Sequence, residues 1–447
     1  MRPYPPLGLL YVSAYLKRQN VDCSIFDTTF STKEKLKAYI LAHRPRFIGI
    51  YVNLMTKLNV LEIMQFIREH PEPKDTYIIL GGPEVRAHKE NFLSAGANVI
   101  VLGEGEETMY EVVTTLGNVF SPFLDTINGI AFVNAKGEVV ETPERPLRKD
   151  IDALPMPDRL GIDLQAYLDV WKKYHGKATT SLSTMRGCPY TCRWCSRAVY
   201  GLSYRRRSPK VVVDEIQWIQ THFEVDAFWV VDDVFTVSHK WLRNFVQELK
   251  DRDVKVNYEC ISRADRMNEE VIDLLKESGC FRVWIGAESG SQRILDAMDR
   301  RVTVEQVGDM IRMSQSKGVQ AGTFIMLGYP GETEEDIEKT IQHLVDSDPD
   351  IYTLTVAYPI AGTPLFTEIE SDITTDLAWN SSTDRDIDFR RTYNRKYYDH
   401  AVRRVFNEVH YHKRLKSKSY PAAANHKLRS LVAKAGMWWE RRKSVST

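Results

Sequence analysis

The sequence predicts two successive α/β domains and a basic helical region after them. First, short apolar strands alternate with amphipathic helices through residues 7–116, which is typical of a doubly wound parallel sheet. Second, six more strand–helix units lie between residues 181 and 366, and six units suit a partial (β/α) barrel better than a full barrel of eight. Third, residues 367–447 combine helical patterning with an excess of basic side chains.

The first domain is expected to span residues 1–142. Apolar periodicity predicts helices over residues 7–19, 33–43, 58–70, 84–95 and 106–116, and strands over residues 21–26, 47–52, 77–80 and 99–102. A β-hairpin is expected over residues 127–140, turning around residues 134–137. The polar, proline-rich run that follows predicts a linker over residues 143–180.

The second domain is expected to span residues 181–366. Its strands are predicted near residues 181–185, 227–231, 256–261, 282–287, 321–327 and 351–357. Helices are expected between them, for example over residues 208–223 and 334–347. Ser238 and Asn268 have the side chains preferred at helix N-caps, and we expect them to begin helices 240–249 and 269–277.

Composition describes an ordinary globular protein. Of 447 residues, 43% are hydrophobic and 27% are charged. No stretch approaches the ~18 apolar residues of a membrane span, and the first residues lack the apolar core of a signal peptide. Only six cysteines occur, three of them clustered, which fits a reducing compartment. We therefore expect a cytoplasmic protein.

Charge is spread unevenly, although the chain has no net charge. Residues 390–447 carry 16 Lys and Arg against 3 Asp and Glu. A solvated C-terminal cap is the preferred interpretation, because charge runs are usually solvated. Peripheral membrane contact is the alternative, since aromatic and basic side chains suit a headgroup region, and nucleic-acid binding is not expected. The interleaved aromatic residues are Tyr393, Tyr397, Tyr398, Phe406, Trp438 and Trp439.

Cys188, Cys192 and Cys195 stand close together in a turn-prone run. A zinc site would want a fourth ligand nearby, and none follows in the next turn. An iron–sulfur cubane also uses cysteine thiolates, usually four, so three would leave one iron open to a ligand that is not protein. A disulfide framework is not expected in so long a chain with so few cysteines. The spacing therefore indicates a cluster-like site.

Polar residues follow each of the six predicted barrel strands. Each cluster alone could be a helix cap, a turn or a surface pair, but barrel chemistry is found at the carboxyl ends of the strands. Together, these acids, arginine and hydroxyls suit a zwitterionic ligand that carries a ribose. In strand order the clusters are the cysteine loop, Asp232-Asp233, Arg263 with Asp265, Glu288-Ser289, residues 328–333 and residues 358–364.

The run Cys188-x-x-x-Cys192-x-x-Cys195, with Trp194 before the last cysteine, resembles the signature of the radical S-adenosylmethionine superfamily. The resemblance implies that the three cysteines hold a [4Fe–4S] cluster whose open iron chelates the methionine end of S-adenosylmethionine. One electron then cleaves the sulfonium and releases a 5′-deoxyadenosyl radical. It also implies an external electron donor of the flavodoxin or ferredoxin type.

The same resemblance implies contacts with S-adenosylmethionine. Asp232 or Asp233 would bind the methionine ammonium, and Arg263 would lie near the carboxylate. Glu288 or Ser289 would lie near the ribose, and the backbone around Trp194 would hold adenine. No residue is assigned a catalytic role.

Glycines and acids follow two strands of the first domain, in Gly81-Gly82-Pro83-Glu84 and Gly103-Glu104-Gly105-Glu106. Alone they are typical of turns and helix caps. Beside the cysteine motif, and with Pro5-Pro6-Leu7-Gly8-Leu9, they resemble the flavodoxin-like cobalamin-binding domain that precedes many radical S-adenosylmethionine enzymes. The implied cobalamin contacts are Pro6, Leu7, Gly8, Gly81, Gly82, Pro83, Glu84, Gly103, Glu104, Gly105 and Glu106.

Two features depart from that domain. The Asp-x-His-x-x-Gly run that supplies a lower cobalt ligand is absent, and no histidine precedes His43, so we expect cobalamin without a protein imidazole. The strand that should precede the first helix is also missing, and we expect an apolar segment of ~5–6 residues upstream of Met1.

The sequence is therefore interpreted as a cobalamin-dependent radical S-adenosylmethionine enzyme that methylates a weakly activated carbon of a small-molecule or lipid substrate. The alternative is a radical rearrangement, cyclisation or oxidation without methyl transfer. A methylthiotransferase would usually need three further N-terminal cysteines, and only Cys23 lies there. A non-enzymatic iron–sulfur protein would not need the polar clusters after the strands.

Overall fold

The computed structural model describes residues 3–117 and 123–444, which form two compact units. The first unit comprises Met1–Pro189, Ser196–Ala227 and Leu377–Asp384. The second comprises Tyr190–Cys195, Phe228–Asp376 and Arg385–Thr447. These units do not follow the predicted domain boundaries, because the expected linker and a short segment from beyond the barrel both pack within the first unit.

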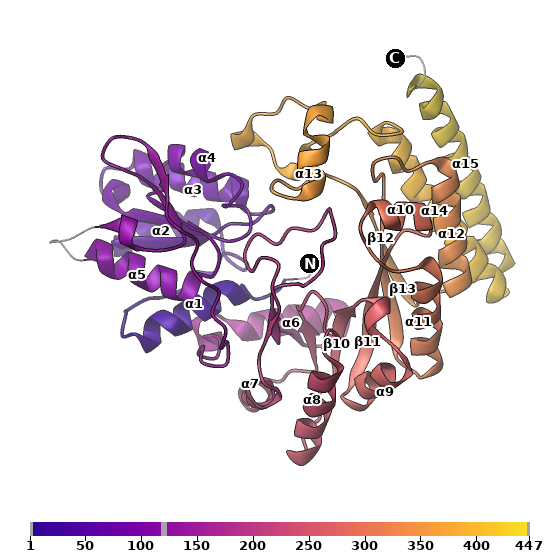
Figure 1. Cartoon of the computed structure of the whole chain (residues 1–447), viewed down its shortest axis with the longest axis horizontal. Coiled ribbons are helices and arrows are strands. Elements are labelled where there is room, and N and C mark those ends of the chain that lie inside the picture. The colour runs from indigo at the N-terminus through magenta and orange to yellow at the C-terminus, as the bar shows by residue number, and fades with distance from the viewer. Residues whose placement is uncertain (1–2, 118–122, 445–447) are drawn as a thin grey trace. The chain divides into compact units, whose positions relative to one another are not determined.

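A five-stranded sheet organises the first unit (Figure 1). Its order is β1-β2-β3-β4-β5, with β1 (Phe47–Tyr51), β2 (Tyr77–Gly81) and β3 (Val99–Val101) parallel. The predicted hairpin is confirmed as β4 (Ile130–Val133) and β5 (Val139–Glu141), and β4 joins β3 in the antiparallel direction. The helices are α1 (Leu7–Arg18), α2 (Lys33–His43), α3 (Lys57–Glu69), α4 (Lys89–Ser94) and α5 (Gly105–Gly117).

Hydrophobic clusters cover both faces of this sheet, because successive strand residues point to opposite sides. Ile78 and Leu80 of β2 pack in one cluster with Met64 of α3. Ile79, between them in sequence, packs in the other cluster with Leu16 of α1 and Val112 of α5. The first unit therefore has the doubly wound α/β arrangement that the sequence predicts.

Two predictions for the first domain are wrong. Residues 21–26 are not a strand, because an extended segment needs a hydrogen-bonded neighbour, and no described residue supplies one there. The helix predicted over residues 84–95 begins only at Lys89. Gly82 (φ +116°) turns the chain after β2, and His88 N donates to Val85 O at 3.3 Å in a tight turn instead of a helical bond.

The expected linker contains a helix that the sequence analysis missed. This helix, α6 (Leu164–His175), has Asp163 as N-cap and ends at Gly176 with φ +77°. Its apolar side chains recur at helical spacing and are buried, namely Leu164, Tyr167, Leu168 and Trp171. The prolines lie in the first half of this stretch, whereas the helical spacing of apolar residues lies in its second half. The linker prediction extended the composition of the first half to the whole stretch.

Four further elements of the first unit surround the cysteine motif in sequence. They are β6 (Thr179–Leu182), β7 (Met185–Arg186), β8 (Arg205–Arg206) and α7 (Pro209–His222). β7 and β8 pair in the antiparallel direction and lie on either side of the cysteine loop in the chain. Ala227 N, at the start of the next strand, donates to Ala178 O, just before β6, at 3.1 Å.

Parallel strands form the sheet of the second unit in the order β13-β12-β11-β10-β9. They are β9 (Ala227–Val230), β10 (Tyr258–Ser262), β11 (Cys280–Glu288), β12 (Gln320–Leu327) and β13 (Ile351–Val356). The intervening helices are α8 (His239–Asp251), α9 (Glu269–Glu277), α10 (Gln292–Ala297), α11 (Val304–Ser316) and α12 (Glu334–Ser347). The N-caps predicted at Ser238 and Asn268 are confirmed by bonds from Trp241 N and Val271 N.

Helices complete the chain, as predicted. After α13 (Pro364–Ile369), α14 (Arg395–Lys416) and α15 (Tyr420–Ser444) pack along one another (Figure 1). Arg404 of α14 pairs with Glu338 of α12, which fastens this helix pair to the parallel sheet's outer layer. Among the described residues, no helix has both the length and the apolar character needed to cross a membrane.

Candidate active site

The segment Tyr190–Cys195 is bound to the carboxyl-terminal side of the second unit's strands. Arg193 N donates to Met298 O at 3.2 Å, and Leu365 N donates to Arg193 O at 2.9 Å. Cys195 N donates to Cys192 O at 3.3 Å, which closes a turn between the two cysteines. This half of the cysteine loop is therefore held by the turn after α10 and by the start of α13.

Cys192 is buried and its sulfur faces two arginines. The Sγ atom lies 3.7 Å from Arg263 Nη1 and 3.8 Å from Arg300 Nη1. Two guanidinium groups beside one sulfur suit a negatively charged thiolate, which is the form that ligates iron. Cys195 and Trp194 are half-buried in the same segment, and Cys188 is half-buried in the first unit.

Arg263, which follows β10, is 2% exposed and holds several partners at once. Nε donates to Asp265 Oδ1 at 2.8 Å, and Nη2 donates to Arg300 O at 2.7 Å. The guanidinium carbon also lies 3.9 Å from the centre of the Tyr190 ring. Since all three nitrogens already have an acceptor, these contacts favour a role in holding the cysteine loop.

Arg300 belongs to the site, although the sequence analysis did not single it out. Nη2 donates to Gly286 O at 3.0 Å, and Nε lies 3.9 Å from Glu288 Oε1. A Cβ at position 286 would stand 2.4 Å from Arg300 Nη2, so a glycine is required there. The only signal in the sequence was this glycine inside a strand, which often marks a close approach.

Glu288 ends β11 in a strained conformation. Its φ is +64°, and the register with β12 shifts between Gly286 and Glu288. Such strain in a residue other than glycine is concentrated at functional sites. Burial raises the pKa of the Glu288 carboxyl, and the charges of Arg300 and Arg263 partly oppose this shift. The bulge places the Glu288 carboxyl group at the end of the sheet.

Asp232 and Asp233 follow β9, as the sequence predicts. Asp232 is buried, whereas Asp233 is exposed. Desolvation by the surrounding protein raises the pKa of the Asp233 carboxyl, and the neighbouring charge of Asp232 raises it further. A positively charged group such as an ammonium would relieve this repulsion, so the pair fits the role that the resemblance implies.

Ser289 has local partners instead. Its Oγ accepts from Ser291 N at 3.1 Å, and Ser291 Oγ donates to Asp336 Oδ1 at 2.6 Å. The Ser289 side chain is 1% exposed. These bonds join the start of α10 to the start of α12, so they favour a structural role for Ser289.

The predicted cobalamin contacts lie in the first unit, around the carboxyl ends of β2 and β3. Gly82 has φ +116°, and a Cβ there would stand 2.4 Å from Val52 O, so the turn itself demands a glycine. Gly103 has φ +107°, and Gly81, Gly82, Pro83, Gly103 and Gly105 are half-buried. Gly8 on α1 is exposed, beside Pro6 and Leu7. Half-open backbone at adjacent strand ends fits a large cofactor.

In the second of these loops, the carboxylates of Glu104 and Glu106 are paired with arginines of the protein. Arg186 Nη1 donates to Glu104 Oε1 at 2.7 Å, and Arg205 Nη1 donates to Glu104 Oε2 at 2.7 Å. Arg186 also binds Glu106. These pairs fasten the β7–β8 hairpin to the start of α5. The carboxylates of Glu104 and Glu106 therefore have arginine partners within the protein, whereas the glycines of these loops are half-buried.

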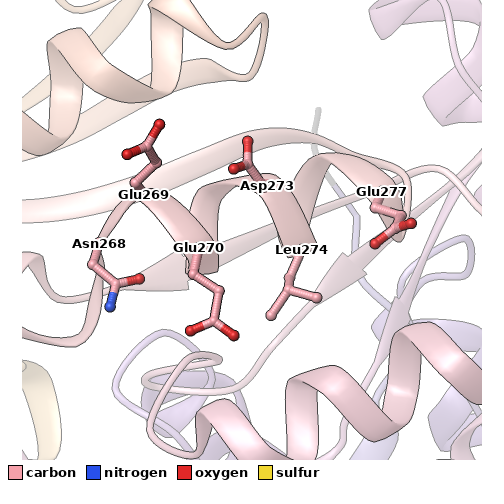
Figure 2. Close-up of a pocket in the computed structure, with 6 residues that line it drawn as sticks. All are labelled: Asn268, Glu269, Glu270, Asp273, Leu274 and Glu277. Atoms are coloured by element: carbon pink, nitrogen blue, oxygen red, sulfur yellow. The ribbon is translucent and has the colours of Figure 1, made fainter.

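A hollow on the outer face of α9 is not part of this site. Figure 2 shows that acidic side chains project from one helix around it. Lys317 pairs with Glu269 and Asp273, and Arg243 pairs with Glu270. The hollow is an ordinary solvated helix face. Its six lining residues are Asn268, Glu269, Glu270, Asp273, Leu274 and Glu277.

Family models match both halves of the chain. The model described as the radical SAM superfamily matches residues 182–344, and the model described as the B12 binding domain matches residues 2–113. The first match contains all three clustered cysteines and the strand ends from β9 to β12. The second contains both glycine-rich loops.

Known proteins are similar to this chain over most of its length. An uncharacterized methyltransferase of Pyrococcus horikoshii is 28% identical over 388 residues, which cover 85% of this chain and 82% of that protein. The anaerobic magnesium-protoporphyrin IX monomethyl ester cyclase of Rubrivivax gelatinosus is 27% identical over 82% of this chain and 66% of its own length. The solved structure of the radical S-adenosylmethionine methyltransferase TsrM from Kitasatospora setae has a TM-score of 0.72 at 19% identity, covering 84% of this chain and 76% of that one.

Proposed function

The chain belongs to the radical S-adenosylmethionine enzymes that carry a B12-binding domain, and on this basis we propose that it is a cobalamin-dependent methyltransferase. Its target is a weakly activated carbon of a small-molecule or lipid substrate. The observation that carries this proposal is that both family models match one chain. A relative named as a methyltransferase is also similar to 85% of this chain.

The described residues fit the implied cofactors. When bound, a [4Fe–4S] cluster supplies the electron that cleaves S-adenosylmethionine, and cobalamin supplies the transferred methyl group. Cys188, Cys192 and Cys195 hold the cluster in this proposal, and the arginines beside Cys192 keep that thiolate in place. Asp232 and Asp233 bind the ammonium of S-adenosylmethionine, because their mutual repulsion favours a cation.

Arg263 and Glu288 have different roles in this proposal. Arg263 is a positioning residue, since it joins the cysteine loop to Asp265 and to the Arg300 backbone. Glu288 hydrogen-bonds a ribose hydroxyl, because its strained backbone places the carboxyl group at the sheet end. The backbone around Trp194 holds adenine.

The glycine backbone of the first unit would hold cobalamin in this proposal, and we expect no histidine of the chain to ligate its cobalt. No histidine precedes His43, and the Nε2 atom of His88 is buried between two carboxylates. Electron paramagnetic resonance of the Co(II) state should show no nitrogen splitting from a protein histidine. A splitting that survives in cobalamin lacking its own base would contradict this.

Product analysis tests the reaction. A methylation of this type consumes two molecules of S-adenosylmethionine, so equal and substrate-dependent amounts of 5′-deoxyadenosine and S-adenosylhomocysteine are expected. The incubation is anaerobic, with reductant, cobalamin and candidate substrates. Substrate consumption with 5′-deoxyadenosine alone would refute methyl transfer and favour a cyclisation or oxidation, the type of reaction that the cyclase relative's name describes.

A matched pair of variants separates the predicted ligand site from general damage. Asp233→Asn should reduce both products together, because the ammonium loses its partner. Asp251→Asn, at the exposed end of α8, should leave both unchanged. Equal activity of the two variants would remove Asp233 from the site.

Peripheral binding to anionic phospholipid is the second function that an observation favours. Helix α15 exposes an apolar stripe, and Arg441, Arg442 and Lys443 occupy its last turn. Arg442 lies 3.7 Å from the centre of the Trp438 ring, so charge and aromatic surface occur together. This combination suits a negatively charged headgroup region. The exposed apolar residues are Leu428, Leu431, Val432, Trp438 and Trp439.

Vesicle sedimentation tests this surface. The full chain should pellet with vesicles containing phosphatidylglycerol and remain free of pure phosphatidylcholine vesicles. Replacing Trp438 and Trp439 by Ala should abolish pelleting, whereas Leu160→Ala, which removes an equally exposed side chain from the first unit, should not. Pelleting that ignores the tryptophans or the lipid charge would contradict the proposal.

A further inference from the structure

Three side chains of the first unit converge where the glycine turn after β2 meets a segment from near the end of the chain. Glu84 and His88 lie in the turn between β2 and α4, and Asp384 ends the segment Leu377–Asp384. One potential ligand atom from each residue lies within 4.8 Å of the other two. Glu84 is 7% exposed and Asp384 is 3% exposed, so both carboxylates are removed from water.

The distances in this cluster do not describe a hydrogen-bonded ion pair. His88 Nε2 lies 3.7 Å from Glu84 Oε1 and 3.7 Å from Asp384 Oδ1, whereas a hydrogen bond would bring such atoms to about 2.7–3.2 Å. Among the described residues, Glu84 Oε1 and His88 Nε2 are buried with no hydrogen-bond partner. Unpartnered buried polar atoms are rare and call for an explanation such as an ion.

Metal coordination explains this geometry. Zinc binds nitrogen and carboxylate oxygen at about 2.0–2.2 Å, which places tetrahedral ligands roughly 3.3–3.5 Å apart. The two histidine–carboxylate separations of 3.7 Å need a contraction of only a few tenths of an ångström, and the two carboxylates lie within 4.8 Å of each other. We propose that Glu84, His88 and Asp384 bind one divalent transition-metal ion such as Zn²⁺, with water as the remaining ligand.

The electrostatics of the cluster support a cation. Glu84 and Asp384 are like-charged carboxylates that share a dry site, so a cation between them would offset their repulsion. Lys57 already brings one positive charge, since its ammonium lies 4.4 Å from the centre of the Trp379 ring and interacts with Glu84. A metal-free network of lysine, histidine and carboxylates is the competing interpretation. That network predicts no zinc binding to the wild type, whereas a metal site predicts zinc binding that tightens when the lysine charge is removed.

The proposed ion has a structural role. Trp379 packs edge-on against Phe92, with ring centres 4.7 Å apart, and contacts the hydrophobic cluster on that face of the sheet. Asp384 lies at the other end of the same segment. An ion that joins Asp384 to Glu84 and His88 therefore clamps the segment to the turn after β2. This inference does not depend on the proposed methyl transfer.

Zinc binding to the full-length protein, purified with its cluster, tests the site. After equilibration with Zn²⁺ and removal of free metal, mass spectrometry should find one zinc per chain. Glu84→Gln preserves side-chain size and His88→Asn replaces the imidazole by a smaller neutral amide, and each should weaken zinc binding at least roughly tenfold. His70→Asn, whose Nδ1 bonds to Phe66 O outside the cluster, is the matched control and should bind as the wild type does.

The change in zinc affinity of Lys57→Met separates the two interpretations. Loss of its positive charge should tighten zinc binding roughly tenfold if the carboxylates bind a metal. Iron, sulfide and far-ultraviolet circular dichroism should remain unchanged in all four variants, which distinguishes loss of this site from loss of the fold or the cluster. Tryptic cleavage after Arg385 should be faster in Glu84→Gln than in the wild type, because the clamp is lost.

Two results would overturn the proposal. One is zinc binding that is absent, or equal in the wild type, Glu84→Gln and His88→Asn. The other is zinc binding that is unchanged or weaker in Lys57→Met, because removing a nearby positive charge must favour a cation held by these carboxylates.

Discussion

Glu332 is expected to make stability depend on pH. It lies in the turn after β12 and is 0% exposed. Oε2 accepts from Gly328 N at 2.6 Å, while Oε1 is buried with no hydrogen-bond partner among the described residues. One neutral donor cannot replace the hydration of a carboxylate. Burial therefore raises the pKa of Glu332 to about 8, with a further contribution from Asp336.

The size of the effect follows from this shift. The folded protein keeps the proton up to about pH 8, whereas the unfolded chain releases it near 4.5. The stabilisation is therefore fully present below the unfolded value and is lost as the pH rises toward 8. Each pH unit in that window costs about 1.4 kcal/mol, so the free energy of unfolding should fall by about 2.5 kcal/mol between pH 5.5 and 7.5.

Glu332→Gln tests this because the amide keeps an acceptor for Gly328 N and cannot ionise. Its unfolding free energy should lack the decline of about 2.5 kcal/mol between pH 5.5 and 7.5. Urea unfolding followed by circular dichroism at several pH values would measure the difference in slope. Glu335→Gln, at an exposed position on the helix that follows Glu332, is the control and should keep the wild-type slope. Parallel pH profiles of wild type and Glu332→Gln would refute the reasoning.

Three further outcomes are expected at the candidate site. Replacing Cys188, Cys192 and Cys195 by Ala should leave no iron or sulfide above background after anaerobic reconstitution. Cys23→Ala should keep the full iron and sulfide content. A cluster retained in the triple variant would contradict the assignment of these three ligands. Arg263→Lys keeps the charge but loses the planar fork, so it should lower the free energy of unfolding by about 2 kcal/mol and speed cluster loss; an unchanged rate of bleaching at 400 nm or so would count against its positioning role. Gly286→Ala places a methyl group 2.4 Å from Arg300 Nη2 and should cost about 1–3 kcal/mol, measured by urea unfolding, because that side chain must shift; wild-type stability would show that the close approach is absent.

The sequence by itself determined the elements whose signals are local. Runs of apolar residues predict strands such as β1 and β12. The side chain of Asn268 is of a type preferred at N-caps, and it predicts the start of α9. The cysteine motif is also local, because its spacing alone lets the sulfurs reach one object. The rule that ligands meet the carboxyl ends of parallel strands then indicated Asp232 and Glu288, since parallel strands present those ends together.

Local sequence signals were insufficient where a residue's structure depends on the segments packed against it. Residues 21–26 have the composition of a strand, yet a strand forms only beside another strand. Residues 84–88 have helical apolar spacing, yet the turn after Gly82 sets their path. Glu104 and Glu106 lie in a loop that resembles a cofactor-binding loop, and only the fold shows that Arg186 pairs with both carboxylates.

Tertiary structure alone brought together residues that are far apart in the chain. Arg300 meets Cys192 across 108 positions, and Asp384 meets Glu84 and His88 across nearly 300. No window of sequence contains such pairs, because which side chains face one another depends on how whole strands and helices pack. Chemical type and spacing were readable in the sequence, while the identity of each side chain's partner was a property of the packed fold.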